Sequence, residues 1–159
     1  MKLCCTLLAV ADMARSRRFY TQLLDLEVEH DFGANLSFYG GLSLQTAESW
    51  RGFLGLPEGG VRFGGSDAEL YFDCGDLDAF VRRLEAWPGL QWVHPLKQHD
   101  WGQRVVRFRD PDGHIIEVGE PMELVCRRFL SAGLTVGQTA ARSQMPLEFV
   151  RRCAAQTQQ

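Results

Sequence analysis

The stretch Asp-Pro-Asp-Gly-His-Ile-Ile-Glu at residues 110–117 decides the fold of this chain. Its first half predicts a tight turn, because Pro111 presets φ and Gly113 accepts a positive φ. Its second half predicts a buried strand that carries one carboxylate, Glu117. A buried carboxylate is costly unless it is paired or bound to a metal, so a cavity-facing Glu117 is a candidate ligand or general base. Strand alternation leaves open that Glu117 faces solvent instead.

Outward from this stretch, the sequence repeats itself. Residues 10–13 match residues 74–77, and residues 41–45 match residues 113–117. Each copy predicts a strand, a helix that begins after an N-cap aspartate, and three further strands. The expected N-caps are Asp12 and Asp76, and the expected strands are 3–10, 26–32, 36–39 and 42–46 in the first copy and 68–74, 91–95, 103–109 and 114–118 in the second.

The repeat divides the chain into four segments. They are a first β-α-β-β-β module (1–50), a glycine-rich connector (51–66), a second such module (67–122) and a helical C-terminal extension (123–159). A curved sheet of four strands with a single helix cannot bury both of its faces alone. We therefore expect the two modules to enclose a cavity between their concave faces.

The C-terminal extension predicts three short helices. An apolar stripe runs over 122–130, Thr135 is the expected N-cap of the second helix, and Pro146 opens the third. Residues 1–122 contain 12 basic and 18 acidic side chains, whereas residues 123–159 contain five basic and two acidic ones. This contrast favours helices that dock on the acidic modules or on a partner subunit. A nucleic-acid partner is not expected, because the excess positive charge is low for tracking phosphates.

Length and composition exclude several protein classes. The chain has 159 residues, 45% hydrophobic and 23% charged, with a formal net charge of −3, which is typical of a globular protein. It contains no apolar run long enough for a membrane-spanning helix, and its first residues do not resemble a secretory signal. Its five cysteines (4, 5, 74, 126 and 153) contain no Cys-x-x-Cys pair, so we expect neither a disulfide framework nor a zinc finger. Scattered thiols of this kind are typical of a reducing compartment, so we expect a cytoplasmic location.

The paired modules and two motifs resemble the vicinal oxygen chelate superfamily, which includes glyoxalase I, bleomycin and fosfomycin resistance proteins and extradiol dioxygenases. The motifs are Val-x-Asp-Met-x-x-Ser-x-x-Phe-Tyr at 10–20 and the stretch at 110–117, and the resemblance covers about residues 1–120. It implies an α+β fold in which two βαβββ modules form a curved mixed sheet around a cavity. It also implies a homodimer, and the helical extension lies outside the superfamily's common core.

The resemblance further implies four inward positions that hold one divalent metal ion. They correspond to Cys5 and Glu69 on the first strands and to Gln45 and Glu117 on the last strands. Metal-binding relatives usually place histidine at one or both first-strand positions, so this donor set is chemically mixed. It suits zinc, manganese, nickel or iron, and binding without any metal is the alternative. Each position also has a structural interpretation: Cys5 as a small buried hydrophobe, Gln45 as a strand-end polar residue and Glu69 as part of a solvated strand face.

A polar and aromatic segment, 94–104, precedes a strand of the second module, and the resemblance places it near the cavity mouth. Arg104 would bind an anionic substrate group or neutralise Glu69 and Glu117, and His99 would serve as an acid or base. The alternative is a surface loop anchored by its tryptophan. This segment contributes three candidate substrate-binding residues: Arg104, Trp101 and His99. Two strand residues, Tyr71 and Phe108, are further candidates and line either the cavity or the core.

Three functional hypotheses follow. The first is a metal-dependent lyase or isomerase acting on a small oxygenated molecule, with Glu69 and Glu117 as catalytic residues and metal ligands. Ring cleavage is disfavoured, because extradiol iron sites use two histidines. The second is a metal-free module that binds a small molecule for resistance or sensing, with affinity from aromatic walls and Arg104. The third, and weakest, is a regulatory protein whose C-terminal extension contacts nucleic acid.

Overall fold

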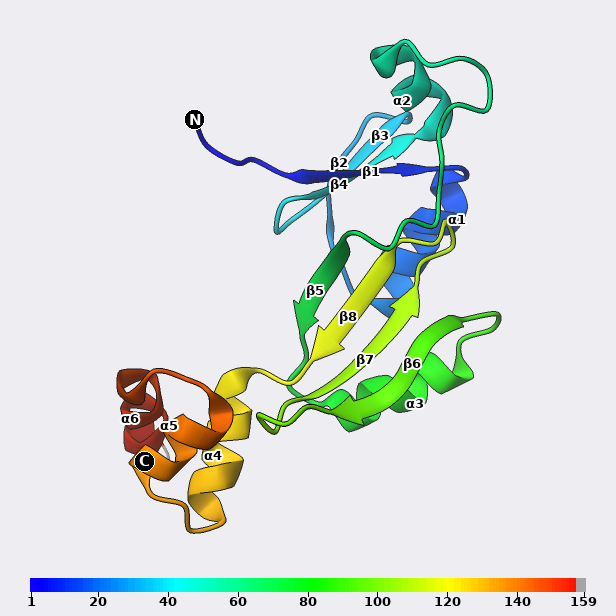
Figure 1. The fold of residues 1–159 in the computed structure, drawn as a ribbon. Helices are drawn as coiled ribbons and strands as arrows, with labels where there is room; N and C mark the ends of the chain where they lie inside the picture. Colours follow the sequence, from blue (N-terminus) through cyan, green and yellow to red (C-terminus); the bar gives the residue numbers. More distant parts are fainter. Residues whose placement is uncertain (157–159) are drawn as a thin grey trace. The chain divides into compact units, whose positions relative to one another are not determined.

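Each half of the chain builds a four-stranded sheet, and the two sheets have the same strand order (Figure 1). In both, the first strand of the module pairs with the last, as expected for an internal repeat. The α+β fold class is therefore confirmed. The first sheet, in the order β1-β4-β3-β2, contains β1 (Thr6–Val10), β2 (Val28–Asp31), β3 (Asn35–Phe38) and β4 (Leu42–Thr46). The second, in the order β5-β8-β7-β6, contains β5 (Glu69–Asp73), β6 (Gln91–Gln98), β7 (Arg104–Arg109) and β8 (Ile115–Gly119).

The computed structural model describes residues 1–156, which form two compact units. The first unit contains Met1–Ala68 together with Gly89–Gln91 and the turn segment Arg109–Ile115. The second contains the remaining described residues, including the C-terminal helices. No helix within the described range is both long and apolar enough to span a bilayer.

The first helix departs from the expected regular helix. Asp12 caps α1 (Met13–Arg18) as predicted, since its carboxylate accepts a hydrogen bond of 3.0 Å from the backbone N–H of Arg15. The chain then continues as a π-helix, η1 (Phe19–Leu23), instead of keeping the α-helical spacing. Three side chains of this π-helix are buried: Phe19, Tyr20 and Leu23. After β4, α2 (Ala47–Leu54) runs from the end of the first module into the glycine-rich connector.

The turn at 110–114 packs against this first helix. Asp110 accepts hydrogen bonds of 2.8 Å from the Tyr20 hydroxyl and 3.0 Å from the backbone N–H of Asp112. Asp112 in turn accepts from Arg15 at 2.7 Å and from the Ser16 hydroxyl at 3.1 Å. Both aspartates are buried and hydrogen-bonded, so this turn stabilises the first unit by holding the first helix in place.

The second unit buries one face of its sheet under α3 (Leu77–Ala86). Asp76 caps this helix as predicted, accepting from the backbone N–H of Ala79 at 2.9 Å. Phe80 of α3 packs against Phe108 of β7, with ring centroids 6.2 Å apart.

Three helices follow the second sheet, as expected: α4 (Met122–Ser131), α5 (Val136–Ser143) and α6 (Leu147–Gln156). Thr135 caps α5 in a complete capping box with Gln138. The helices share a small core around Cys126, Val150 and Cys153. They form their own apolar cluster at the end of the second unit.

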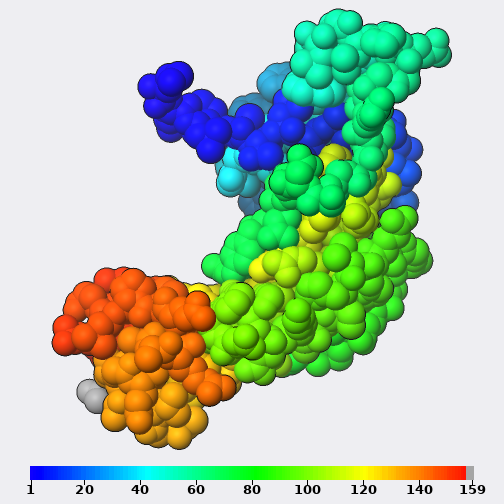
Figure 2. All heavy atoms as spheres, in the orientation of Figure 1, coloured from blue at the N-terminus to red at the C-terminus, as the bar shows by residue number. Residues whose placement is uncertain are grey.

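This helical cluster docks on the second sheet through one glycine and one carboxylate. Gly102 has φ of +91°, and a Cβ built there would lie 2.2 Å from the Phe129 ring of α4, so only glycine permits this approach. Arg128 of α4 donates to Glu120 at 2.9 Å and to the carbonyl oxygen of Gly102 at 2.6 Å. Figure 2 shows the atoms of α4 (orange) adjoining those of the second sheet (light green).

Candidate functional site

An arginine on β7 joins two carboxylates of neighbouring strands in the second sheet. Arg107 Nε donates to Glu69 Oε2 of β5 at 2.9 Å, and its Nη2 forms an ion pair with Glu117 of β8. Glu117 is only 5% exposed, so the sheet does not turn it toward solvent. The predicted alternative that Glu117 is a solvated strand residue is therefore wrong. The carboxylate is buried and paired, as a buried charge requires.

A histidine on β6 extends this row across the sheet. His94 Nε2 lies 3.2 Å from Arg107 Nη1, and its Nδ1 lies 2.9 Å from the carbonyl oxygen of Pro95. A carbonyl needs a donor and a guanidinium needs an acceptor, so this network assigns the neutral tautomer with its hydrogen on Nδ1. We call Glu69, Arg107, Glu117 and His94 the Arg107 cluster.

The first sheet does not bring its two expected ligands together. Gln45 of β4 is buried and pairs in register with Ala9 of β1. Its Oε1 accepts from Asn35 at 2.8 Å and its Nε2 donates to Ser49 at 2.7 Å, so the amide is fully engaged. Cys5 is exposed and precedes β1. At about 3.3 Å per residue, Cys5 lies roughly 13 Å along the strand from the position opposite Gln45.

A second polar row lies further along the second sheet, toward the C-terminal helices. Gln103 accepts a hydrogen bond from Trp101 Nε1 at 3.1 Å and donates to the Tyr71 hydroxyl at 2.8 Å. Its amide also donates to the Glu120 carbonyl oxygen at 2.9 Å. A Cβ at Gly119 would lie 3.0 Å from both the Gln103 amide and the Tyr71 hydroxyl, so glycine makes room for this row.

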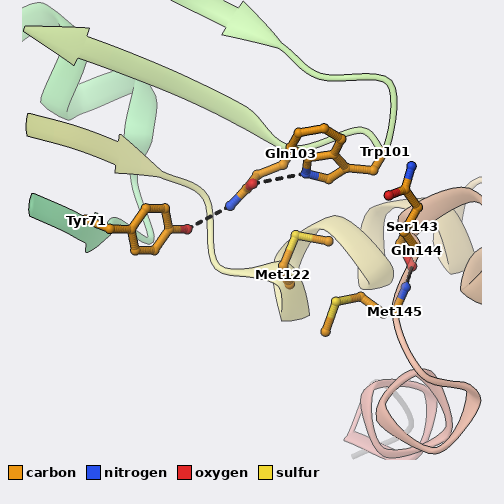
Figure 3. Close-up of a pocket in the computed structure, with 7 residues that line it drawn as sticks. All are labelled: Tyr71, Trp101, Gln103, Met122, Ser143, Gln144 and Met145. Carbon is orange, nitrogen blue, oxygen red and sulfur yellow. Dashed lines mark hydrogen bonds between the residues drawn. The ribbon is translucent and has the colours of Figure 1, made fainter. Parts of the chain in front are cut away.

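A pocket of about 340 Å³ opens beside this row, and Figure 3 shows its lining. One wall comes from the sheet and the loop before β7, and the other comes from α4 and the junction between α5 and α6 (Figure 3). We call it the C-terminal pocket. Its lining residues are Tyr71, Trp101, Gln103, Met122, Ser143, Gln144 and Met145.

A sequence profile described as a glyoxalase-like domain matches residues 3–123. The chain belongs to the glyoxalase-like domain family. It is thereby a member of the vicinal oxygen chelate superfamily, as the two motifs and the repeat predicted. The match ends at residue 123, so nearly all of α4 and the whole of α5 and α6 lie outside the glyoxalase-like domain.

Solved structures with this fold come from several bacteria. A protein of unknown function from Agrobacterium tumefaciens str. C58 is 35% identical with a TM-score of 0.69, over 76% of this chain and 94% of that one. A lactoylglutathione lyase from Agrobacterium tumefaciens is 27% identical with a TM-score of 0.57, over 75% and 92%. A glyoxalase/bleomycin resistance protein/dioxygenase from Nocardioides, 22% identical with a TM-score of 0.59 over 76% and 83%, shares the fold. No curated protein matches the sequence.

The glyoxalase-like fold implies a metal site, and the residues at the expected positions do not suit one. A divalent ion needs free, negatively charged or carbonyl oxygens converging on one point. Here Glu69 and Glu117 both hold the Arg107 guanidinium, whose positive charge would repel a cation at the same oxygens. In residues 1–156 no group of three or more His, Cys, Asp and Glu side chains is arranged to hold a metal ion.

Arg104 has different partners from those expected. It was expected either to bind an anionic substrate group or to neutralise Glu69 and Glu117. The second role is wrong, because Arg104 forms ion pairs with Asp78 at 2.9 Å and Glu120 at 2.7 Å. Strand alternation is the reason: Arg104 and Arg107 are three residues apart on β7, so they project from opposite faces. The hydrogen bonds to Glu120 and Asp78 raise the pKa of Arg104 above its ordinary value. Its guanidinium thus joins α3 to Glu120, the residue that follows β8.

The buried Glu120 carboxylate anchors the C-terminal helices to the glyoxalase-like domain. Burial opposes its ionisation, but hydrogen bonds from Arg128 and Arg104 outweigh burial and hold the pKa of Glu120 below its ordinary value. It is therefore ionised near neutral pH and keeps both arginines in place.

The other predicted substrate-binding residues separate into two groups. The His99 ring stacks on the Trp101 ring next to the C-terminal pocket, with the ring centroids 4.1 Å apart and an interplanar angle of 11°. Burial and the charge of Arg107 lower the pKa of His99, which favours its neutral form. Burial and the hydrogen bond to Asp73 raise the pKa of Tyr71 to about 12, so its phenol is also neutral. Phe108 has no exposed surface and belongs to the core under α3, as the core-lining alternative stated.

Sequence reasoning missed the residues that organise both rows of the site. Arg107 was visible as one of three arginines in the predicted strand 103–109, but its partners depend on the register between strands. Gln103 carried no sequence signal, because a single amide beside a tryptophan is common on surfaces. The pocket residues of the C-terminal helices were not predicted, because that segment was interpreted as docked helices or, less favoured, as a nucleic-acid contact.

Proposed function

We propose that this glyoxalase-like protein binds a small organic molecule on the second sheet without a metal ion, as a resistance or sensing module. The observation that carries the proposal is the position of Arg107, which is ion-paired with both Glu69 and Glu117. In a metal-dependent relative these positions would offer free carboxylates to the ion. Here the guanidinium supplies the positive charge that the two carboxylates need.

The charge of the Arg107 cluster favours a ligand with hydrogen-bond donors. Two carboxylates, one guanidinium and a neutral histidine leave the Arg107 cluster with one net negative charge. Glu69 keeps 37% of its side chain exposed, so its carboxylate is reachable from solvent. A hydroxyl or amine group of a ligand would donate to these oxygens, in the way charge-assisted hydrogen bonds favour.

A metal-dependent lyase or isomerase is the second candidate, and the likeness to a lactoylglutathione lyase at 27% identity favours it. That function would require Arg107 to release both carboxylates. It would also require Cys5 and Gln45 to approach each other, although their register separates them along β1 and β4. These two costs make metal-free binding the better proposal.

Metal analysis separates the two functions. Untagged protein would be purified without chelator, incubated anaerobically with zinc, manganese, nickel and iron(II) in turn, desalted and measured by elemental analysis. We expect no stoichiometric metal in the parent chain and no difference from Glu117→Gln. One equivalent of metal in the parent that Glu117→Gln loses would overturn the proposal. A Cys5→Ser variant separates adventitious thiolate binding at the exposed cysteine from binding at the carboxylates.

We propose two further properties that follow from family membership and from composition. The protein forms a homodimer, which light scattering coupled to size-exclusion chromatography would measure. It resides in the cytoplasm, in keeping with a cysteine spacing that predicts no disulfide framework. Cell fractionation of the native host would test the location.

A further inference from the structure

We propose that the C-terminal pocket is a separate binding site for an uncharged, planar aromatic molecule that carries one hydrogen-bonding group. This site goes beyond the binding proposed for the Arg107 cluster. Four of its lining residues come from the segment that begins at Met122, at the very end of the glyoxalase-like domain. The extension therefore adds a site that the family domain alone does not contain.

The lining contains no acidic or basic side chain. It presents the rings of Tyr71 and Trp101 and the thioethers of Met122 and Met145 (Figure 3). Aromatic rings and methionine sulfur both pack favourably on another aromatic ring. A charged ligand would lose its hydration without gaining an ionic partner here, so the pocket selects for neutral molecules.

Most polar groups of the lining are already engaged with the protein. The Gln103 amide makes three hydrogen bonds, to Trp101, Tyr71 and the Glu120 carbonyl oxygen. The buried Ser143 hydroxyl donates to the Thr139 carbonyl oxygen at 2.7 Å. These groups fix the walls but offer little to a ligand, so affinity must come from the apolar surfaces.

Gln144 is the polar side chain left for the ligand. It is exposed, stands directly after α5 with φ of +58°, and lines the pocket. Its amide can donate to or accept from one polar substituent. A phenol-type or indole-type molecule meets this requirement, since it combines a flat apolar ring with a single donor group.

The walls are rigid before any ligand arrives. Trp101 is held by the hydrogen bond from its Nε1 and by His99 stacked on one face. The helical wall is held by Phe129 against Gly102 and by Arg128 on Glu120. A preorganised pocket loses less conformational entropy on binding. Its volume of about 340 Å³ lies at the small end of ligand pockets and suits a ligand of one or two rings.

The test uses 2-naphthol as the neutral probe and 2-naphthoate as a charged probe of similar shape, each titrated into the full chain by isothermal calorimetry. We expect one 2-naphthol per chain and at least tenfold weaker binding of 2-naphthoate. Met145→Glu should weaken 2-naphthol binding at least tenfold, and the milder Met145→Gln should weaken it less. Equal affinity for the two probes would overturn the proposal.

Matched variants locate the probe. Leu96→Glu places the same charge in another groove of the second unit and should leave the affinity unchanged. This groove is lined by Val81, Glu85, Trp92, Pro95 and Leu96. Arg107→Met should also leave it unchanged. If Leu96→Glu weakens binding as much as Met145→Glu, or if binding is lost with Arg107, the probe sits elsewhere and the proposal fails. Far-ultraviolet circular dichroism and thermal unfolding confirm that each variant is folded. If Met145→Glu does not fold, Met145→Gln replaces it in the comparison with Leu96→Glu.

Discussion

Tyr20 donates a 2.8 Å hydrogen bond to Asp110, which lies 90 residues further along the chain. Both side chains are buried, with exposed fractions of 0% and 1%. The two motifs on which the family resemblance rests, at 10–20 and at 110–117, are therefore the two sides of one contact. Through Tyr20 and Asp110 they hold a turn against a helix, and the second motif also contains one site residue, Glu117.

Replacing Tyr20 by phenylalanine should destabilise the first unit. The change removes one donor from a buried, ionised carboxylate and leaves the ring packing intact, so we expect a loss of about 1–2 kcal/mol in the free energy of unfolding. Urea unfolding followed by circular dichroism would measure it. Tyr39→Phe is the matched control, because Tyr39 is 61% exposed, and it should change the stability little. An equal effect of the two substitutions would contradict a special role for the Tyr20 hydroxyl.

The pair Asp110–His114 should make stability depend on pH from both sides. Burial opposes ionisation of Asp110, but hydrogen bonds from His114 and Tyr20 outweigh it and lower the pKa of Asp110. Burial also opposes protonation of His114, but the hydrogen bond and charge of Asp110 outweigh it and raise the pKa of His114. Both groups are charged in the folded state between these two values.

The directions of the two pKa shifts set the pH range in which the Asp110–His114 pair stabilises the folded state. The contribution of Asp110 is complete above the ordinary aspartate pKa of about 3.9 and is lost as the pH falls through its lowered value. The contribution of His114 is complete below the ordinary histidine pKa of about 6.5 and is lost as the pH rises through its raised value. Unfolding free energy measured from pH 3 to 9 should therefore peak between about 4 and 6.5. His114→Gln should remove much of the decline on the alkaline side, whereas the exposed His30→Gln should keep it.

Local signals in the sequence predicted most of the fold. The N-caps Asp12, Asp76 and Thr135 act within three residues of themselves, so the starts of α1, α3 and α5 follow from short-range chemistry. The internal repeat then predicted the same succession of one strand, one helix and three strands in both modules, and the strand order within each sheet came from the structure. The π-helix at Phe19–Leu23 was missed, because its wider turn depends on what the side chains pack against.

The site was predictable only in part, because its contacts join distant strands. The sequence left open whether Glu117 faces a cavity or solvent, and it offered Arg104 either as a binder of an anionic substrate group or as a partner of Glu117, whereas the structure buries Glu117 and pairs it with Arg107. Choosing between two arginines on one strand requires knowing which face of β7 meets β8. Likewise, Gln45 and Cys5 align by family position, yet the register pairs Gln45 with Ala9.

Replacing Arg107 by methionine should raise the affinity of the second sheet for a divalent metal ion. The substitution keeps much of the side-chain volume and removes the cation between Glu69 and Glu117, so the two carboxylates would attract Mn²⁺ or Zn²⁺. We expect at least about tenfold tighter binding than in the parent, equivalent to about 1.4 kcal/mol. Calorimetry with MnCl₂ would measure it. Arg82→Met, on the exposed surface of α3, removes the same charge elsewhere and should bind Mn²⁺ no better than the parent. A gain of equal size in both variants would show a general charge effect.

Replacing Gly102 by alanine should detach the C-terminal helices from the second sheet. The new methyl group would meet the Phe129 ring at 2.2 Å, and φ of +91° disfavours any L-residue, so we expect a loss of at least about 2 kcal/mol. Amide hydrogen exchange should rise in α4 around Phe129 while the first unit is unchanged. Gly137→Ala is the matched control, because that glycine lies within α5 and a Cβ there meets nothing within 4 Å; it should be neutral or stabilising by up to about 1 kcal/mol. In the double variant Gly102→Ala/Phe129→Ala, removal of the ring relieves the collision, so the two losses should not add. Strict additivity would show that the glycine is needed for its backbone conformation alone and does not seat the ring.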